Sequence, residues 1–210
     1  MVLYDKDIRE PLFDFLEETY GKIRIIEEKQ TGSARADVVM ITPEVLYGIE
    51  IKSDADTYTR LDKQVENYNS YYDRNIIVVG SSHAHHVKEH VPDWWGIITV
   101  EVNDAGEADF YVVRNPEDNP KVKDERKITI LWRPELNHLL EKNNLPKYKE
   151  KSKLFVQEKL LEKVSGEILW PQAYEELFER DYTTISEKIN EYRAEKGQKP
   201  RRKKRRKYKK

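Results

Sequence analysis

The chain has 210 residues, of which 37% are charged and 38% hydrophobic, and it contains no cysteine, which excludes a disulfide framework and cysteine zinc sites. A chain of this length can bury one core of ordinary size and carry an additional segment. Because no apolar run approaches the roughly 20 residues that cross a bilayer, and the charged N-terminus lacks the apolar segment of a signal peptide, we expect a cytoplasmic protein with no membrane partner.

Hydrophobic periodicity predicts an α/β sandwich with a candidate site at one end of a central sheet. A polar loop at residues 115–127 separates this part from four later helical stretches. The first part is expected to contain a helix at 7–20, strands at 23–28, 35–42 and 46–52, a helix at 57–73, a strand at 75–79, a helix at 83–91, and strands at 97–102 and 108–113. The later helices are expected at about 133–144, 152–165, 171–180 and 183–197.

Charged residues interrupt two strands that are otherwise apolar: Asp37 in the first, and Glu50 with Lys52 in the second. Burying a carboxylate without a partner costs several kcal/mol, so a structural or functional role must offset the cost of these charged residues. A hairpin centred on Pro43 and Glu44 pairs residues whose numbers sum to 87, which places Asp37 directly opposite Glu50. Their Cβ atoms would then lie roughly 5 Å apart.

Side chains alternate along a strand, so Glu50 and Lys52 share one face. With the register above, Asp37 lies on that polar face. The opposite, apolar face is then formed by Val38, Met40, Ile49 and Ile51.

Two carboxylates at this spacing suit a hard divalent cation with oxygen ligands, Mg²⁺ or Mn²⁺. A lysine beside them can orient a water molecule and offset negative charge on a phosphate. The alternative is a salt-bridged group of three residues on a solvated sheet face. Spacing alone does not decide between these interpretations.

The helix expected at 57–73 places Gln64 and Tyr68 one above the other, because residues four apart share a helix face. An amide and a phenol at this position can hydrogen-bond a DNA phosphate or a metal-bound water. The alternative is that Tyr68 belongs to the core and Gln64 is its exposed neighbour.

Four of the five histidines lie near the stretch 83–91. His86 and His90 are four residues apart, a spacing that can bind zinc. No third ligand fits a known pattern, so a solvated helix face is the favoured interpretation. Trp94 and Trp95 follow a tight turn, and we expect core packing rather than stacking on single-stranded bases.

The net charge of −1 conceals an asymmetry. Residues 199–210 contain ten Lys and Arg and no acid, whereas the remainder carries 28 basic and 39 acidic residues, a net charge of −11. A basic block of this kind is expected to be disordered alone and to bind a polyanion such as nucleic acid. The alternative is a solubilising or self-associating tail that touches the acidic body. The candidate nucleic-acid contacts in this block are Arg201, Arg202, Lys203, Lys204, Arg205, Arg206 and Lys207.

The motif formed by Asp37, twelve intervening residues and then Glu50-Ile51-Lys52 resembles the PD-(D/E)xK nuclease superfamily, with Ala36 in place of the usual proline. A longer run is similar to the sce7726-like proteins of bacteria and phages, which are related to the MmcB-like DNA repair group. The similarity covers roughly residues 5 to 165. The residues that carry it are Arg35-Ala36-Asp37, Tyr47-Gly48-Ile49-Glu50-Ile51-Lys52-Ser53-Asp54, Asp56-Thr57, Arg60-Leu61, Gln64-Val65, Tyr68, Pro92-Asp93-Trp94-Trp95-Gly96-Ile97, Leu131-Trp132, Glu135-Leu136 and Leu139-Leu140.

The resemblance implies a restriction-endonuclease-like αβββαβ core with a mixed central sheet, followed by a helical C-terminal appendage. On this basis we expect a nuclease-like domain at 1–114, a helical region at 128–197 and a disordered basic tail at 198–210. It implies a fold more firmly than a reaction.

The same resemblance implies roles for individual residues. Asp37 and Glu50, helped by the Ile51 carbonyl, would hold one or two Mg²⁺ or Mn²⁺ ions. Lys52 would position the attacking water. Gln64 with Tyr68 resembles the Gln-x-x-x-Tyr motif of RecB-like nucleases, which would hold the DNA backbone.

Three further candidates complete the expected site. The superfamily often supplies an acid from the first helix, and Glu10 is the candidate, although an acid near a helix N-terminus is also favourable by itself. Glu27 and Glu28 compete for this role. Arg35 and Arg60 would neutralise phosphates.

We therefore predict a Mg²⁺- or Mn²⁺-dependent DNA phosphodiesterase acting in DNA repair, recombination or phage DNA processing. The alternatives are a non-catalytic nucleic-acid-binding protein that keeps a nuclease-like fold, and an RNA-associated protein that uses only the tail. The sequence leaves a homodimer, or a repair or phage protein as partner, open.

Overall fold

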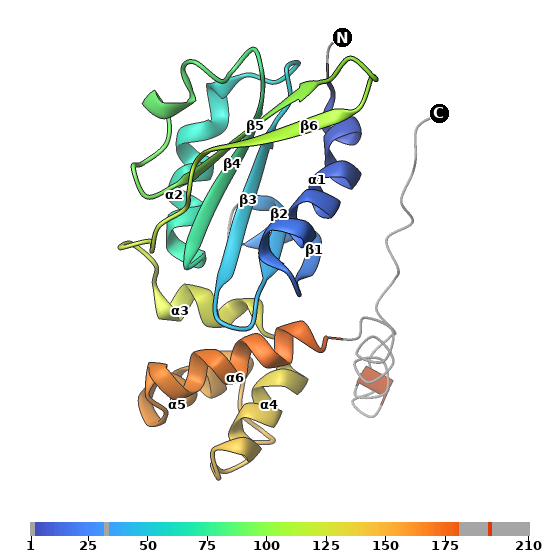
Figure 1. The fold of residues 1–210 in the computed structure, drawn as a ribbon. Helices are drawn as coiled ribbons and strands as arrows, with labels where there is room; N and C mark the ends of the chain where they lie inside the picture. The colour runs from blue at the N-terminus through green and yellow to red at the C-terminus, as the bar shows by residue number, and fades with distance from the viewer. Residues whose placement is uncertain (1–2, 32–33, 181–192, 195–210) are drawn as a thin grey trace. The chain divides into compact units, whose positions relative to one another are not determined.

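The computed structural model describes residues 3–31, 34–180 and 193–194 (Figure 1). Met1–Phe178 form one compact unit, and Glu179–Lys210 form a second. Apart from residues 193–194, the helix expected at 183–197 lies outside the described residues, and so does the expected tail at 198–210. The sheet and helices α1 to α6 belong to the first unit, and the predicted domain boundaries stay predictions.

A six-stranded mixed sheet forms the centre of this unit, with its strands in sequence order. Neighbouring strands are antiparallel from β1 to β3, parallel from β3 to β5, and antiparallel between β5 and β6. This arrangement confirms the α/β class. The strands are β1 Arg24–Thr31, β2 Ala34–Ile41, β3 Leu46–Lys52, β4 Arg74–Gly80, β5 Gly96–Val102 and β6 Ala108–Arg114.

Helices cover both faces of the sheet, with α1 on one face and α2 on the other (Figure 1). A 3-10 turn at Tyr58–Arg60 leads into α2, and α2 provides the crossover between the parallel strands β3 and β4. Between β6 and Phe178, four further helices follow (Figure 1). The helices are α1 Asp5–Tyr20, α2 Leu61–Tyr71, α3 Asp124–Lys127, α4 Arg133–Lys142, α5 Lys153–Lys163 and α6 Gly166–Phe178.

Two cores lie on the two faces of the sheet. The buried residues of α1 pack on the β2 and β3 face that carries Val38, Met40, Ile49 and Ile51, as the alternation of side chains predicted. The buried residues of α2 pack on the opposite face, and this core continues into α4, α5 and α6. The second core therefore joins the later helices to the sheet.

The register between β2 and β3 confirms the predicted hairpin. Val38 lies opposite Ile49, and Met40 lies opposite Tyr47. The residue numbers of each pair sum to 87, as predicted. The turn at residues 42–45 therefore sets the register that brings Asp37 beside the Glu50 end of β3.

Asp73, which precedes β4, links the later helices to the sheet. Its Oδ1 accepts a hydrogen bond from Lys127 Nζ at 2.7 Å, and its Oδ2 accepts from Tyr174 Oη at 2.5 Å and from the Leu46 N–H at 3.0 Å. The Lys127 ammonium lies 3.7 Å from the centre of the Trp170 ring. The Lys127 side chain is 5% exposed, and its contacts with an anion and an aromatic ring offset the cost of burying its charge.

Three expected elements differ in the structure. The helix expected at 83–91 is wrong: this stretch consists of turns with a short 3-10 helix at Val87–Glu89. Val87 is the only buried residue of 81–90, so the stretch has no apolar stripe to dock a helix. Pro92 further disfavours helical backbone at the residue before it.

The last two differences concern the later helices. Helix α6 begins at Gly166, five residues before the expected start, and contains Pro171 in its interior. An interior proline weakens a helix by about 3 kcal/mol, and the burial of the α6 face offsets this cost. The loop expected at 115–127 ends in the short helix α3. Within the part of the chain that the structure describes, no helix is both long and apolar enough to cross a membrane.

Candidate active site

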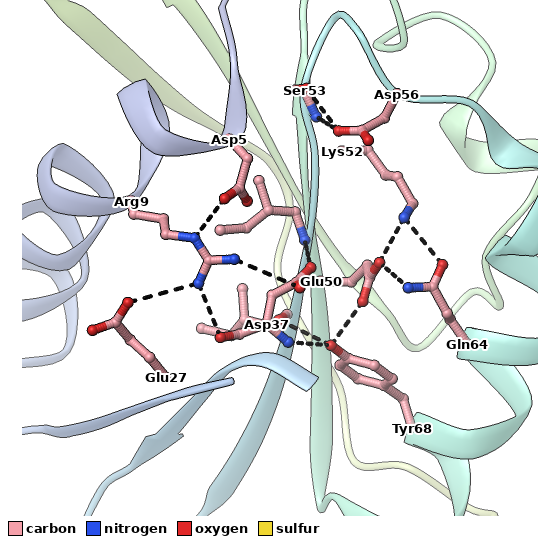
Figure 2. Close-up of polar contacts among 12 residues, drawn as sticks. Asp5, Arg9, Glu27, Asp37, Glu50, Lys52, Ser53, Asp56, Gln64 and Tyr68 are labelled. Atoms are coloured by element: carbon pink, nitrogen blue, oxygen red, sulfur yellow. Dashed lines mark hydrogen bonds and ion pairs between the residues drawn. The ribbon is translucent and has the colours of Figure 1, made fainter. Parts of the chain in front are cut away.

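A cleft lies where the start of β2 and the end of β3 meet, with α1 on one side and α2 on the other (Figure 2). Because β2 and β3 are antiparallel, the start of one strand and the end of the other lie at the same edge of the hairpin. Residues far apart in the sequence thus converge there. The cleft is lined by Asp5, Arg9, Arg35, Asp37, Glu50, Ile51, Lys52, Asp56, Arg60, Lys63 and Gln64.

Glu50 is the buried centre of the site, with a side chain only 1% exposed. Lys52 Nζ donates to its Oε1 at 2.6 Å, and Tyr68 Oη donates to its Oε2 at 2.8 Å. The Gln64 amide also donates to Oε1 and accepts a hydrogen bond from Lys52 Nζ at 3.0 Å. The predicted site residues Lys52, Gln64 and Tyr68 therefore all donate hydrogen bonds to the Glu50 carboxylate (Figure 2).

Asp37 lies beside this group and is less completely satisfied. Its Oδ2 accepts a hydrogen bond from the Ile51 N–H at 3.0 Å, and its Oδ1 lies 3.7 Å from Arg9 Nη2. Burial and the nearby charge of Glu50 raise the pKa of Asp37 to about 7. Asp37 is thus a partly buried acid held close to a second, fully buried carboxylate.

Tyr68 belongs to the core, and its hydroxyl lies at the site. Its ring is fully buried and packs at 5.4 Å from Tyr72 and 5.6 Å from Trp95, measured between ring centres. Its hydroxyl donates to Glu50 and accepts a hydrogen bond from the Asp37 N–H at 3.1 Å. Burial and the Glu50 charge raise the pKa of Tyr68 well above its usual range, so the phenol stays protonated and remains a donor.

Helix α1 contributes Asp5 and Arg9 to the cleft rather than Glu10. Arg9 Nε donates to Asp5 Oδ2 at 2.6 Å, and Arg9 Nη1 donates to the Asp37 carbonyl at 3.2 Å. Glu10 is exposed and is not among the residues that line the cleft. Each helical residue rotates the side chain by about 100°, so the face shared by residues 5 and 9 turns away at residue 10.

The structure also places the other candidates. Arg35 and Arg60 line the cleft as expected. Glu27 lies at its margin, where its carboxylate is 3.8 Å from Arg9 Nη1. The Glu28 side chain and the candidate residues at 201–207 lie outside the described part.

Four residues that line the cleft were not predicted from the sequence: Asp5, Arg9, Asp56 and Lys63. Asp5 and Arg9 are an acid and a base four residues apart on one helix, which was the signal available for them. Asp56 accepts hydrogen bonds from the Ser53 N–H at 2.9 Å and the Ser53 hydroxyl at 2.7 Å. This contact orders the turn that follows Lys52.

The donor set can be tested against a divalent cation. Among the residues that the structure describes, no three His, Cys, Asp or Glu side chains are grouped as a metal site. The site offers two carboxylates, Asp37 and Glu50, and the Ile51 N–H donates to Asp37. Mg²⁺ is commonly bound by one or two carboxylates together with water and substrate phosphate. The oxygen donors, and the two close acids whose burial and repulsion raise the pKa of Asp37, fit Mg²⁺ or Mn²⁺.

Within the described residues, the histidines are not grouped as a metal site. The Tyr58 ring packs between His83 and His90, with ring centres 4.7 Å and 4.3 Å away. His86 Nδ1 lies 3.5 Å from a Glu89 carboxylate on the exposed surface. The His-rich stretch is therefore a packed turn beside the cleft.

Comparison with known proteins identifies the family. The model of the family described as bacteriophage P4 protein cII matches residues 2–202. The chain belongs to this family. The match includes the cleft and the later helices α3 to α6. Neither the curated proteins nor the solved structures provided a match.

Proposed function

We propose that this protein is a Mg²⁺- or Mn²⁺-dependent nuclease that hydrolyses phosphodiester bonds in DNA. The single observation that carries the proposal is the constellation around Glu50. A buried carboxylate contacts Lys52, Gln64 and Tyr68, and a second carboxylate, Asp37, lies on the neighbouring strand. A purely structural salt bridge has no need for a second, partly buried acid with a raised pKa.

The fold supports the same proposal. The elements α1, β1, β2, β3, α2 and β4 follow one another in the αβββαβ order of a restriction-endonuclease-like core. The candidate site lies where the start of β2 and the end of β3 meet. The resemblance to PD-(D/E)xK nucleases predicts a site on these two strands. In this proposal α4 to α6 are the helical C-terminal appendage.

The residues of the site have separate roles in the proposed hydrolysis. A water oxygen forms the new bond to phosphorus, the bond to one ester oxygen breaks, and the leaving oxygen takes up a proton. A bound divalent cation supplies Lewis-acid stabilisation of the phosphate charge, and Asp37 and Glu50 would hold it. The Lys52 ammonium, held by Glu50 and Gln64, orients the attacking water and offsets charge on the phosphate.

The other residues position these groups. Tyr68, as a permanent donor, fixes the orientation of the Glu50 carboxylate. Arg9, Arg35 and Arg60 line the cleft and neutralise neighbouring phosphates. Membership in a family named after a bacteriophage protein is compatible with phage DNA processing, repair or recombination in the cytoplasm.

The test is cleavage by the full chain of single-stranded, duplex and branched DNA with Mg²⁺ or Mn²⁺. We expect Lys52→Ala to abolish cleavage while leaving DNA binding nearly intact. Lys88→Ala removes an exposed lysine outside the cleft and is the matched control. Absence of cleavage by the wild-type protein on all three substrates, or full activity of Lys52→Ala, would refute the proposal.

One observation favours a second candidate, a non-catalytic nucleic-acid-binding protein. Both oxygens of Glu50 already accept hydrogen bonds from protein donors, so the carboxylate is satisfied without a cation. In that case DNA binding would be unaffected by divalent cations. Calorimetric titration with Mn²⁺ separates the two candidates, because only the nuclease requires a cation site that Asp37→Asn and Glu50→Gln weaken.

A further inference from the structure

A second groove is lined by residues of α2 and of the segment that leads into α3. We propose that this groove binds the sugar–phosphate backbone of the DNA strand that extends from the active-site cleft. The inference deepens the proposed function and rests on it for the identity of the strand. The groove is lined by Lys63, Glu66, Asn67, Asn69, Ser70, Tyr71, Pro120, Lys121, Val122, Lys123 and Arg126.

The lining of the groove is predominantly basic. Lys63, Lys121, Lys123 and Arg126 are exposed, and Glu66 is the only acid in the lining. None of these four basic side chains forms an ion pair with another residue in the described part of the chain. Residues 1–120 carry 24 Asp and Glu but only 12 Lys and Arg, so the groove is a basic strip on an acidic body. Uncompensated cations in such a place suit phosphate groups.

The groove and the cleft share one lining residue, Lys63. The groove then follows α2 from Lys63 to Ser70, which corresponds to about 10 Å at 1.5 Å per residue. Phosphates of one strand advance by about 3.4 Å along the axis of a duplex, so the groove accommodates roughly three phosphates beyond the cleft.

A buried asparagine holds the two walls of the groove together. Asn119 Nδ2 donates to the carbonyls of Asn69 at 2.9 Å and Tyr72 at 2.7 Å, at the C-terminal end of α2. The Lys123 N–H donates to the Ser70 carbonyl at 3.2 Å. The basic side chains therefore extend from a backbone that is already ordered, which lowers the entropy cost of binding.

Trp94 gives Lys121 a defined position. The Lys121 ammonium lies 5.3 Å from the centre of the Trp94 ring, a cation–π contact. The indole N–H of Trp94 donates to Asn69 Oδ1 at 3.4 Å, which ties the ring to α2. Lys121 is thus held beside the groove.

The test is DNA binding by the full chain in EDTA, where no cleavage occurs, measured by fluorescence anisotropy at several salt concentrations. The variant is Lys121→Gln, Lys123→Gln and Arg126→Gln together. We expect its slope of log affinity against log salt to fall by about 2.7 on duplex DNA and about 2 on a single strand, at roughly 0.9 and 0.7 per lost contact. The melting temperature should stay close to that of the wild type, because the three side chains are exposed.

Two further variants make the result specific. Lys147→Gln, Lys149→Gln and Lys151→Gln remove the same charge from the α4 to α5 connection, outside the groove and the cleft, and should leave the slope within about 0.5 of wild type. Replacing the three groove residues by the other basic residue, Lys by Arg and Arg by Lys, should retain the wild-type slope. An unchanged slope in the groove variant, or an equal loss in the control, would overturn the inference. Because the measurement needs no divalent cation, failure of the wild-type protein to cleave DNA would refute the proposed nuclease but not the groove.

Discussion

Replacing Asp37 by asparagine should stabilise the protein without cations while it removes a cation ligand. Burial and the Glu50 charge raise the pKa of Asp37 from 3.8 to about 7. The folded state therefore binds more protons than the unfolded state between these values, and stability falls as the pH rises from about 4 to about 7. At roughly 1.36 kcal/mol per unit, ionised Asp37 costs about 4 kcal/mol at pH 8.

Asparagine has no charge to ionise, and its Oδ1 can still accept the hydrogen bond from the Ile51 N–H. The variant loses the attraction to Arg9 at 3.7 Å, which is worth less than about 1 kcal/mol because Arg9 keeps its contact with Asp5. We expect Asp37→Asn to be more stable than wild type by about 2–4 kcal/mol at pH 8, and to have nearly equal stability at pH 4.

The assay is urea denaturation of both proteins in EDTA from pH 4 to pH 8, followed by repetition at pH 8 with Mn²⁺. Wild type should gain about 2.7 kcal/mol at a concentration 100 times its dissociation constant, and the variant should gain much less. A difference in stability that does not change with pH would refute the assigned pKa. An equal gain with Mn²⁺ in both proteins would refute the cation site.

Three further predictions concern positioning and the tail. Tyr68→Phe should reduce cleavage and destabilise the protein by about 1–3 kcal/mol, because Glu50 and the Asp37 N–H each lose a partner; Tyr68→Phe with unchanged cleavage would show that the ring alone matters. Gln64→Ala should reduce cleavage with little change in melting temperature, since Gln64 is partly exposed; a large loss of stability instead would make Gln64 a structural residue. Truncation after Gln198 removes ten basic residues and should flatten the salt dependence of DNA binding measured by anisotropy; an identical slope would mean that the tail does not contact DNA.

The hairpin at the site was predictable because it is local. A short turn between two largely apolar strands sets the pairing, and the pairs Val38 with Ile49 and Met40 with Tyr47 have the predicted register. The alternation of side chains then decides which of them share a face. The position of Asp37 beside the Glu50 end of β3 needed no information from the rest of the chain.

Helical elements with weak or conflicting local signals were less predictable. The helix expected at 171–180 begins at Gly166 instead, because the packed face of α6 extends it. The stretch at 83–91 had helical spacing between its histidines, yet it buries only Val87 and forms turns. Tertiary packing overrides local preference at such places because the burial of an apolar face contributes more than propensity does.

The sequence by itself determined which residues carry charge into the core, and that they lie on one face of one hairpin. Only the tertiary structure decided that Arg9 rather than Glu10 completes the cleft, because the rotation of a docked helix selects the side chains that face inward. It also decided that Lys63 and Lys121 share one groove, because Asn119 holds their segments together. Such contacts join residues that are distant in the chain, and they depend on how helices pack on a sheet, which no local pattern encodes.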